Sequence, residues 1–378
     1  MRRTATLIGL LATAAPAAAH HLTTPPIVQL TSSGDNTLPR VPSFDDTVAL
    51  VLGPAVYSLR LFDHPEVRTP VSAGGHNANP TVSLRAVAFD SDGDPLGSGD
   101  PGRQVFMRAG ATLVQVTHDP TGTSANPAFD YFSDLLAFES AGDLTGSGSL
   151  GTLQVYLRDG YGGLVQLSRG RGTSRNPSLG RRATWIAFDS TTDPVTGVDT
   201  GVSQIWLSSP DPTTSHPITA GAGPSRRPSM SNRGRIMAFE SDADLAGGGA
   251  DTGIPQIFVY DLVSGNFAQL TQDAGGCSGA SVRRFGDWRI TFTCGGQAFY
   301  FDLRADHRYR LPIDGGNTNG VGPGAAFYFL TVSTTADHLG AGTTTGHEIY
   351  LLNLYKRPAE LVSGSAVWFP ARGLAPPR

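Results

Sequence analysis

Short apolar runs alternate with glycine- and proline-rich turns along most of the chain, and the pattern returns about every 50 residues. In four consecutive copies an apolar run ends in Ala-Phe-acid-Ser, with its phenylalanine at Phe89, Phe138, Phe188 and Phe239. A turn with a proline precedes each of these runs, a glutamine opens the run that follows, and a short fourth run closes the copy. Four alternating runs separated by turns predict one four-stranded antiparallel sheet for each repeat.

Degenerate copies flank these four, and together they divide the chain into seven units: 37–73, 74–120, 121–170, 171–220, 221–272, 273–314 and 315–363. Four strands within a period of about 40–50 residues are typical of a propeller blade. The sequence therefore predicts an all-β fold, a β-propeller of four-stranded antiparallel blades, seven by repeat count. Segments 27–31 and 359–362 both fit the strand that closes the ring, and the sequence leaves this choice open.

The unit at 221–272 carries the fullest form of the repeat, with Arg227-Pro228 before the turn, Ile236 to Ser241 in the second run and Gln256 to Leu262 in the third. In these motifs the repeats resemble those of TolB-like β-propellers, and in their long loops they are similar to bacterial exported variants. The resemblance covers most of 37–363 and implies the fold, but no activity, because propellers host many unrelated functions. Family propellers of this kind usually have six blades, so six remains an alternative to seven.

The two ends of the chain lack the repeat pattern. Residues 1–19 contain two early arginines, a short apolar stretch and an Ala-x-Ala site at 17–19, which predicts a signal peptide. We expect 20–36 to be an N-terminal segment, 37–363 the propeller and 364–378 a C-terminal tail. No later apolar run approaches the roughly 18 residues of a membrane span. The expected location is therefore the periplasm or the outside of the cell.

Composition narrows the class of partner. Charged residues make up 16% of the chain, the formal net charge is −4, and Lys356 is the only lysine. A nucleic-acid binder usually shows a strong basic excess, so we expect no nucleic acid. We expect a monomer that binds a protein or peptide partner in the cell envelope.

The two cysteines fall at related places in one degenerate unit. Cys294 occupies the serine position of the Ala-Phe-acid-Ser motif, and Cys277 is aligned with Thr123 and its counterparts Thr173 and Pro224. The start of a first strand and the end of an antiparallel second strand are neighbours, so we expect a disulfide. The alternatives are two free thiols, or a nucleophile turn at 275–279.

An aspartate recurs five residues after the repeat phenylalanine, at Asp94, Asp143, Asp193 and Asp244, and a glycine follows it. The structural interpretation is an Asx-turn that closes on backbone N–H groups. The functional alternative is a weak calcium site, for which the first loop offers Asp90, Asp92, Asp94 and Asp100. We expect no other cofactor.

Two further residue types recur. The repeated glutamines at Gln104, Gln154, Gln204, Gln256 and Gln297 predict structural contacts to backbone groups. Several first strands carry arginines, and we expect Arg175, Arg226 and Arg227 to form a basic rim with the aspartate loops around it. Such a basic mouth on an acidic protein suits an anionic peptide or ligand.

No catalytic motif emerges from the nine histidines or from the serine and glycine patterns. The leading hypothesis is an exported, non-catalytic propeller that acts as a protein- or peptide-binding scaffold. The first alternative is a glycan-acting propeller enzyme with paired carboxylates. The second is a calcium-stabilised extracellular scaffold.

Overall fold

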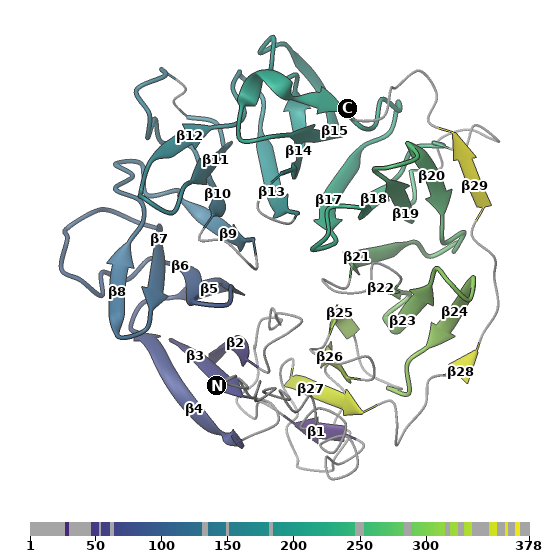
Figure 1. The fold of residues 1–378 in the computed structure, drawn as a ribbon, viewed down its shortest axis with the longest axis horizontal. Coiled ribbons are helices and arrows are strands. Elements are labelled where there is room, and N and C mark those ends of the chain that lie inside the picture. The colour runs from purple at the N-terminus through teal and green to yellow at the C-terminus, as the bar shows by residue number, and fades with distance from the viewer. Residues whose placement is uncertain are drawn as a thin grey trace, which may run out of the picture.

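The computed structural model describes residues 27–29, 47–52, 54–60, 64–130, 135–148, 151–180, 184–245, 253–282, 289–313, 318–323, 329–334, 348–353, 360–361 and 367–370. The expected signal peptide at 1–19 lies outside these residues. The described strands form seven sheets, one for each repeat unit. Figure 1 shows the sheets arranged around a common centre, and we number them as blades in chain order.

Blades 1 to 4 come from the first half of the chain, and every described strand pair in them is antiparallel. Their strands are β2 (Thr47–Leu52), β3 (Ala55–Arg60) and β4 (His64–Ala73) in blade 1; β5 (Asn77–Val82), β6 (Ala86–Ser91), β7 (Gln104–Ala109) and β8 (Thr112–Gln115) in blade 2; β9 (Ala125–Phe129), β10 (Leu136–Ser140), β11 (Gln154–Arg158) and β12 (Leu164–Gln166) in blade 3; β13 (Ser174–Leu179), β14 (Ile186–Thr192), β15 (Asp199–Ser208) and β16 (His216–Pro217) in blade 4. A short 3₁₀ helix, η2 (Pro212–Thr214), connects the last two strands of blade 4.

Blades 5 to 7 follow the same plan, but two of them gain a fifth strand from the C-terminal part of the chain. Their strands are β17 (Ser225–Met230), β18 (Ile236–Ser241), β19 (Gln256–Asp261) and β20 (Asn266–Gln269) in blade 5; β21 (Cys277–Val282), β22 (Arg289–Cys294), β23 (Gln297–Asp302) and β24 (His307–Arg310) in blade 6; β25 (Thr318–Pro323), β26 (Phe329–Thr334) and β27 (Glu348–Asn353) in blade 7.

The N-terminal segment closes the ring. Strand β1 (Ile27–Gln29) pairs antiparallel with β27 and supplies the fourth strand of blade 7. The competing segment goes elsewhere: β28 (Glu360–Leu361) pairs with β24 at the outside of blade 6, and β29 (Val367–Pro370) pairs with β20 at the outside of blade 5. The chain therefore runs back along the outer edge of the ring after its last blade (Figure 1).

The core lies between neighbouring blades rather than inside any one sheet. The repeat phenylalanine is fully buried in each of five blades, at Phe89, Phe138, Phe188, Phe239 and Phe292. In four of these blades its ring stacks on the aromatic residue opposite it on the third strand, with ring centroids 5.7–5.9 Å apart. Each buried cluster combines residues of two adjacent blades, so burial of apolar area holds the blades to one another.

Among the described residues, no helix is long and apolar enough to cross a membrane.

Candidate functional site: the inner rim of the ring

The first strands of blades 2 to 6 share an irregularity near their start. The pairing register between the first and second strands shifts there. The residue at each shift has a positive φ, between 47° and 70°; these residues are Asn79, Asn126, Asn176, Arg227 and Gly279. Glycine has no Cβ to clash in this left-handed region, and asparagine enters it more readily than other residues with a side chain. Arginine has no such preference, so Arg227 is the strained member of the set.

A buried acid in each of blades 2 to 5 joins this irregularity to the next blade. Within a blade, the side chain at the irregular position donates to the acid of Ala-Phe-acid-Ser: Asn79 to Asp90 (2.8 Å), Asn126 to Glu139 (2.7 Å), Asn176 to Asp189 (2.8 Å) and Arg227 to Glu240 (3.3 Å). Between blades, the same acid accepts from a backbone N–H: that of Asn126 to Asp90 (3.0 Å), Asn176 to Glu139 (2.6 Å), Arg227 to Asp189 (3.0 Å) and Gly279 to Glu240 (2.7 Å).

We call Asp90, Glu139, Asp189 and Glu240 the inter-blade acids. Together they tie blades 2 to 6 into a series. In blade 6 the equivalent position is Thr293, whose hydroxyl donates to the Ser278 carbonyl of its own blade at 3.2 Å. The described series therefore ends at blade 6.

The inter-blade acids are almost completely buried, with exposed fractions of 0 to 7%. Burial raises the pKa of Glu139 from its ordinary value of 4.5 to about 7, and the negative charge of Asp189 adds to the rise. Hydrogen bonds from Asn126 and Asn176 and the positive charge of Arg175 oppose it. Burial also raises the pKa of Asp189. A low-dielectric site disfavours the charged form of a carboxyl group, and these hydrogen bonds compensate only in part.

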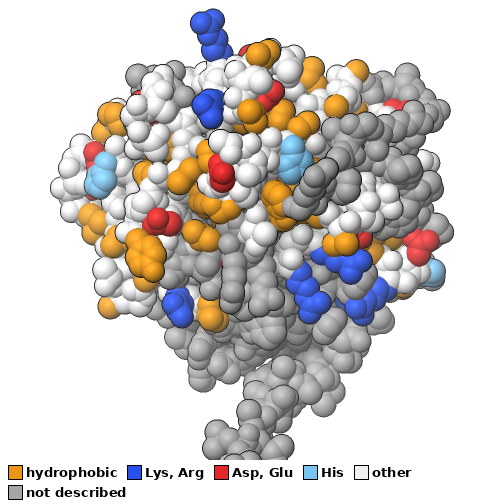
Figure 2. Space-filling model, turned by 45° about the horizontal axis from the view of Figure 1, so that its top comes forward, with side chains coloured by type: hydrophobic (Ala, Val, Ile, Leu, Met, Phe, Trp, Pro, Cys, Tyr) orange, Lys and Arg blue, Asp and Glu red, His pale blue; other side chains and the backbone are white. Residues whose placement is uncertain are grey.

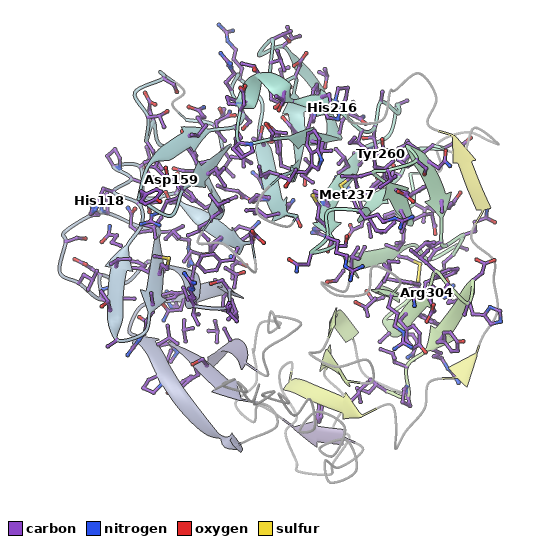
Figure 3. All side chains as sticks on the ribbon, viewed as in Figure 1. His118, Asp159, His216, Met237, Tyr260 and Arg304 are labelled. Atoms are coloured by element: carbon purple, nitrogen blue, oxygen red, sulfur yellow. A yellow bond between two sulfur atoms is a disulfide. The ribbon has the colours of Figure 1, made fainter. Side chains whose placement is uncertain are left out.

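The three rim arginines lie next to this series. Arg175 and Arg226 hold the same position in blades 4 and 5, opposite Asp189 and Glu240 in the register. Arg175 is exposed, and the side chains of Arg226 and Arg227 are 47% and 63% exposed. Figure 3 shows nitrogen-tipped side chains from this part of the ring reaching toward its centre. The structure therefore brings the three predicted arginines together on neighbouring first strands.

Two of these arginines face carboxylates of their own blade. Arg227 Nη1 lies 3.3 Å from Glu240, and Arg226 Nη1 lies 3.8 Å from Asp242 Oδ2. The other oxygen of Asp242 is buried without a hydrogen-bond partner. In blade 2 the His76 N–H donates to the equivalent Asp92 at 2.6 Å, but blade 5 has Pro224 at that place and proline has no N–H. Asp242 therefore keeps unused acceptor capacity beside the rim. Figure 2 shows several arginine side chains gathered on one part of the surface, whereas the acidic side chains are scattered.

The repeated glutamines form internal clamps, as the sequence predicts. Gln104 donates to the Pro101 and Asp119 carbonyls and accepts from the Thr117 hydroxyl and the Asp119 N–H. The equivalent glutamines of blades 3 to 5 bind the hydroxyl and the carbonyls that follow the fourth strand in the same way. These amides fix the crossing from one blade to the next.

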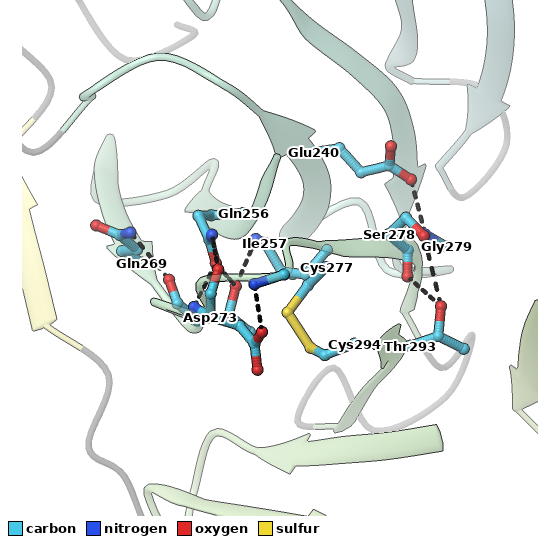
Figure 4. Close-up of a disulfide and its surroundings, with 12 residues drawn as sticks. Glu240, Gln256, Ile257, Gln269, Asp273, Cys277, Ser278, Gly279, Thr293 and Cys294 are labelled. Atoms are coloured by element: carbon cyan, nitrogen blue, oxygen red, sulfur yellow. Dashed lines mark hydrogen bonds between the residues drawn. A yellow bond between two sulfur atoms is a disulfide. The ribbon is translucent and has the colours of Figure 1, made fainter. Parts of the chain in front are cut away.

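The predicted disulfide is confirmed. Cys277 and Cys294 are bonded, and they lie directly opposite each other with Cα atoms 4.2 Å apart (Figure 4). The register corrects the sequence alignment by one residue: Cys277 matches Ser174 and Ser225, not Thr173 and Pro224. In blades 4 and 5 these serines bond to the motif serine at 2.8 and 2.9 Å. The disulfide therefore replaces a hydrogen-bonded serine pair.

The recurring aspartates accept backbone N–H groups of their own loops, as the structural interpretation predicts, but Asp94 and Asp143 bond four and five residues on, whereas Asp193 makes the two-residue bond of an Asx-turn. Asp94 accepts from the N–H groups of Ser98 and Gly99, both at 2.8 Å, and Asp143 accepts from Ser147 and Gly148, both at 2.7 Å. These backbone hydrogen bonds lower the pKa of both carboxyl groups. The first-strand starts pair with the second-strand ends, so these loops leave the same end of the blades as the rim arginines.

The calcium candidates each have separate partners. Asp90 accepts from Arg103 as well as from Asn79 and Asn126, Asp92 bonds to His76, and Asp100 bonds to Gln115 and His118. Within the described ranges, three metal-ligating atoms come within 4.8 Å of one another only at Asp273, Cys277 and Cys294, and the two sulfurs there form the disulfide. A calcium site at Asp90, Asp92, Asp94 and Asp100 stays a prediction, to be tested by calorimetric titration.

Sequence reasoning missed the inter-blade acids, although it singled out their motif. The signal is a pair of residues that recurs in blades 2 to 4: an asparagine before the proline and, 11 to 13 residues later, an acid. Chemically, the rim can bind an anion through its arginines and accept a hydrogen bond or a positive charge at Asp242.

Neither a protein-family model nor a curated protein matches the chain. Several solved structures, however, match the chain. An oligogalacturonate lyase in complex with manganese aligns with a TM-score of 0.60 at 14% identity, over 86% of this chain and 92% of that one. The β-propeller domain of the trilobed protease from Pyrococcus furiosus aligns with a TM-score of 0.57 at 10% identity, over 88% and 98%. TolB from Acinetobacter baumannii aligns at 0.47 and 13%, over 91% and 83%. The chain is a β-propeller, which confirms the predicted fold class.

Proposed function

We propose that the protein is an exported, non-catalytic propeller that binds an acidic or zwitterionic segment of a protein partner at its arginine rim. The observation that carries the proposal is the placement of Arg175 and Arg226. These arginines occupy one repeat position in adjacent blades, where blades 2 and 3 have Ala78 and Ala125. The rim charge is thus concentrated at blades 4 and 5.

The expected compartment has two supports. The Cys277–Cys294 bond fits an oxidising environment, because disulfides form and persist mainly outside the cytosol. The start of the sequence has the pattern of a signal peptide.

A pull-down from a cell-envelope fraction tests the binding proposal. The wild-type chain is compared with the double variant Arg175→Gln/Arg226→Gln, which removes both charges without placing an acid next to Asp242. The matched control is Arg233→Gln, which alters an exposed arginine in the turn at the other end of blade 5. We expect the rim variant to capture at least five-fold less partner and the control to capture as much as the wild type. Equal capture by the rim variant and the control would refute the rim.

The likeness to an oligogalacturonate lyase supports a second candidate function, a glycan-acting enzyme. An oligogalacturonate is an anionic glycan, and arginines at a propeller mouth suit an anionic sugar as well as an acidic peptide. A reducing-sugar release assay on a glycan panel that includes oligogalacturonates separates the two. Release of reducing ends that Arg175→Gln/Arg226→Gln abolishes would favour the glycan-acting enzyme over the scaffold.

A further inference from the structure

The crossing from blade 3 to blade 4 carries two arginines that lie outside the rim. Its sequence is Arg169-Gly170-Arg171-Gly172, and it connects β12, the outer strand of blade 3, with β13, the first strand of blade 4. Arg169 and Arg171 are exposed, and neither guanidinium has a hydrogen-bond or ion-pair partner among the described residues. Arg175 follows near the start of β13, so the crossing adds two charges beside the rim, on the same end of the ring.

The two glycines of this crossing let its backbone lie directly against the end of β14. A Cβ on either glycine would collide with the Thr192 side chain, and a Cβ on Gly172 would also collide with the Thr191 hydroxyl. The Gln154 amide holds the crossing as well, since it donates to the carbonyls of Gly170 at 3.2 Å and Gly172 at 3.1 Å. The backbone is therefore fixed at the glycines, and the arginine side chains are left in solvent.

The fold does not require arginine at these two places. The crossing from blade 4 to blade 5 has the same spacing of two glycines, at 221–223, and the Gln204 amide donates to both glycine carbonyls, at 2.9 and 3.5 Å. There Ala220 and Ala222 stand in place of the two arginines, and both are exposed. The crossings at 117–123 and 270–276 contain no lysine or arginine. Alanine therefore suits the same backbone, and the two charges are peculiar to one crossing.

We propose that Arg169 and Arg171 form a second anion subsite, which binds acidic side chains of the partner segment where that segment leaves the rim. The inference rests on the proposed function and adds the path of the segment, from Arg175 outward over the crossing between blades 3 and 4. Arginine suits this role because its planar fork of donors can bind both oxygens of a carboxylate.

The spacing of the arginines sets the length of segment that can reach both subsites. Arg169 and Arg175 are six residues apart in the sequence. A chain spans at most about 3.6 Å per residue, so their Cα atoms lie within about 22 Å of each other. An extended peptide rises about 3.3 Å per residue, so about seven residues are enough to reach from the rim to the far end of the crossing.

Fluorescence anisotropy with a labelled octaglutamate peptide tests the subsite on the full-length chain. The variant Arg169→Ala/Arg171→Ala gives this crossing the Ala-Gly-Ala-Gly sequence of the next one, so its melting temperature should stay unchanged. We expect this variant to bind the peptide at least five-fold more weakly than the wild type. The matched control is Arg233→Ala/Arg304→Ala, which removes two exposed arginines from turns at the opposite end of the ring (Figure 3 labels Arg304). The control should bind within two-fold of the wild type.

The rim variant Arg175→Gln/Arg226→Gln, measured with the same peptide, separates this inference from the proposed function. If only the rim variant loses affinity, the crossing is not a subsite and the rim stands. If only the crossing variant loses affinity, the anion site at the crossing stands without the rim. Equal loss in the crossing variant and the control would show only general charge attraction and overturn the subsite. Absence of binding by the wild type would overturn both, and tighter binding of an oligogalacturonate of eight sugars would overturn the choice of a peptide.

Discussion

Arg227 shows how one residue can serve the rim at a cost to the fold. It takes the left-handed conformation that asparagine takes in blades 2 to 4, and its guanidinium reaches Glu240 where an asparagine amide would otherwise do so. Left-handed backbone costs a residue with a Cβ about 1–2 kcal/mol, and asparagine less. The arginine therefore retains the contact to the acid, adds a charge at the rim and strains the backbone.

Replacing Arg227 by asparagine should relieve that strain. We expect Arg227→Asn to raise the free energy of unfolding by about 0.5–1 kcal/mol, because the amide can still donate to Glu240. Arg227→Glu should lower it, because a second carboxylate would then adjoin the buried Glu240. Denaturant unfolding at pH 7 measures both. An asparagine variant less stable than the wild type would show that the backbone at 227 is not strained.

At the scale of the strand pair, the disulfide of blade 6 is a variant of a contact that other blades make with serines. Ser174 with Ser190 and Ser225 with Ser241 occupy the same opposed positions as Cys277 with Cys294. The covalent bond closes a loop over a sequence separation of 17 residues. Its main effect in the chain-entropy view is to restrict the unfolded chain, whereas the serine pair contributes only a hydrogen bond.

The double variant Cys277→Ser/Cys294→Ser should therefore keep the fold. Loss of the cross-link lowers the free energy of unfolding by about 3 kcal/mol, and the new serine hydrogen bond raises it by about 1 kcal/mol. We therefore expect a net decrease of about 2 kcal/mol. The control Cys277→Ala/Cys294→Ala should lose about 1 kcal/mol more than the serine pair. Denaturant midpoints under non-reducing conditions compare the three chains. Equal stability of the serine and alanine pairs would argue against the equivalence.

The sequence predicts the blades and the disulfide because both follow from the register within one repeat. The alignment error at Cys277 arose because the connection between the first two strands is one residue longer in blade 6, where Val282 pairs with Ile290, than in blade 5, where Met230 pairs with Met237. The inter-blade acids depend on contacts between repeats, such as that of Asn176 with Glu139, which no single repeat contains. The path of 359–362 was open because this segment and 27–31 are both short apolar runs, and so short a run has too little pattern to choose its edge.

At the scale of the whole molecule, apolar clusters and buried carboxylates link the same blades. The clusters are non-directional, whereas each inter-blade acid accepts defined hydrogen bonds from two blades. The cost is the desolvation of a charge, which is visible in the raised pKa values of Glu139 and Asp189. The ring should therefore become more stable as these acids gain a proton.

The sign of this pH dependence follows from linkage. The pKa of Glu139 is about 7 in the folded chain and near 4.5 in the unfolded chain, so the folded state binds the proton more tightly. The stabilisation that this tighter proton binding gives the folded chain is complete below pH 4.5 and is lost as the pH rises to about 7. The full effect is on the order of 3 kcal/mol. Asp119, whose pKa is lowered to about 2, titrates below this window.

The most direct measurement of the inter-blade link is the unfolding free energy of the wild type and of Glu139→Gln from pH 4.5 to pH 8. A glutamine oxygen can still accept from Asn126 and Asn176, but it carries no charge to bury. We expect the two chains to be equally stable at pH 4.5, and the variant to be more stable by about 2–3 kcal/mol at pH 8. A difference that stays constant with pH, or a variant less stable than the wild type at pH 8, would contradict a buried, proton-binding Glu139 between blades 3 and 4.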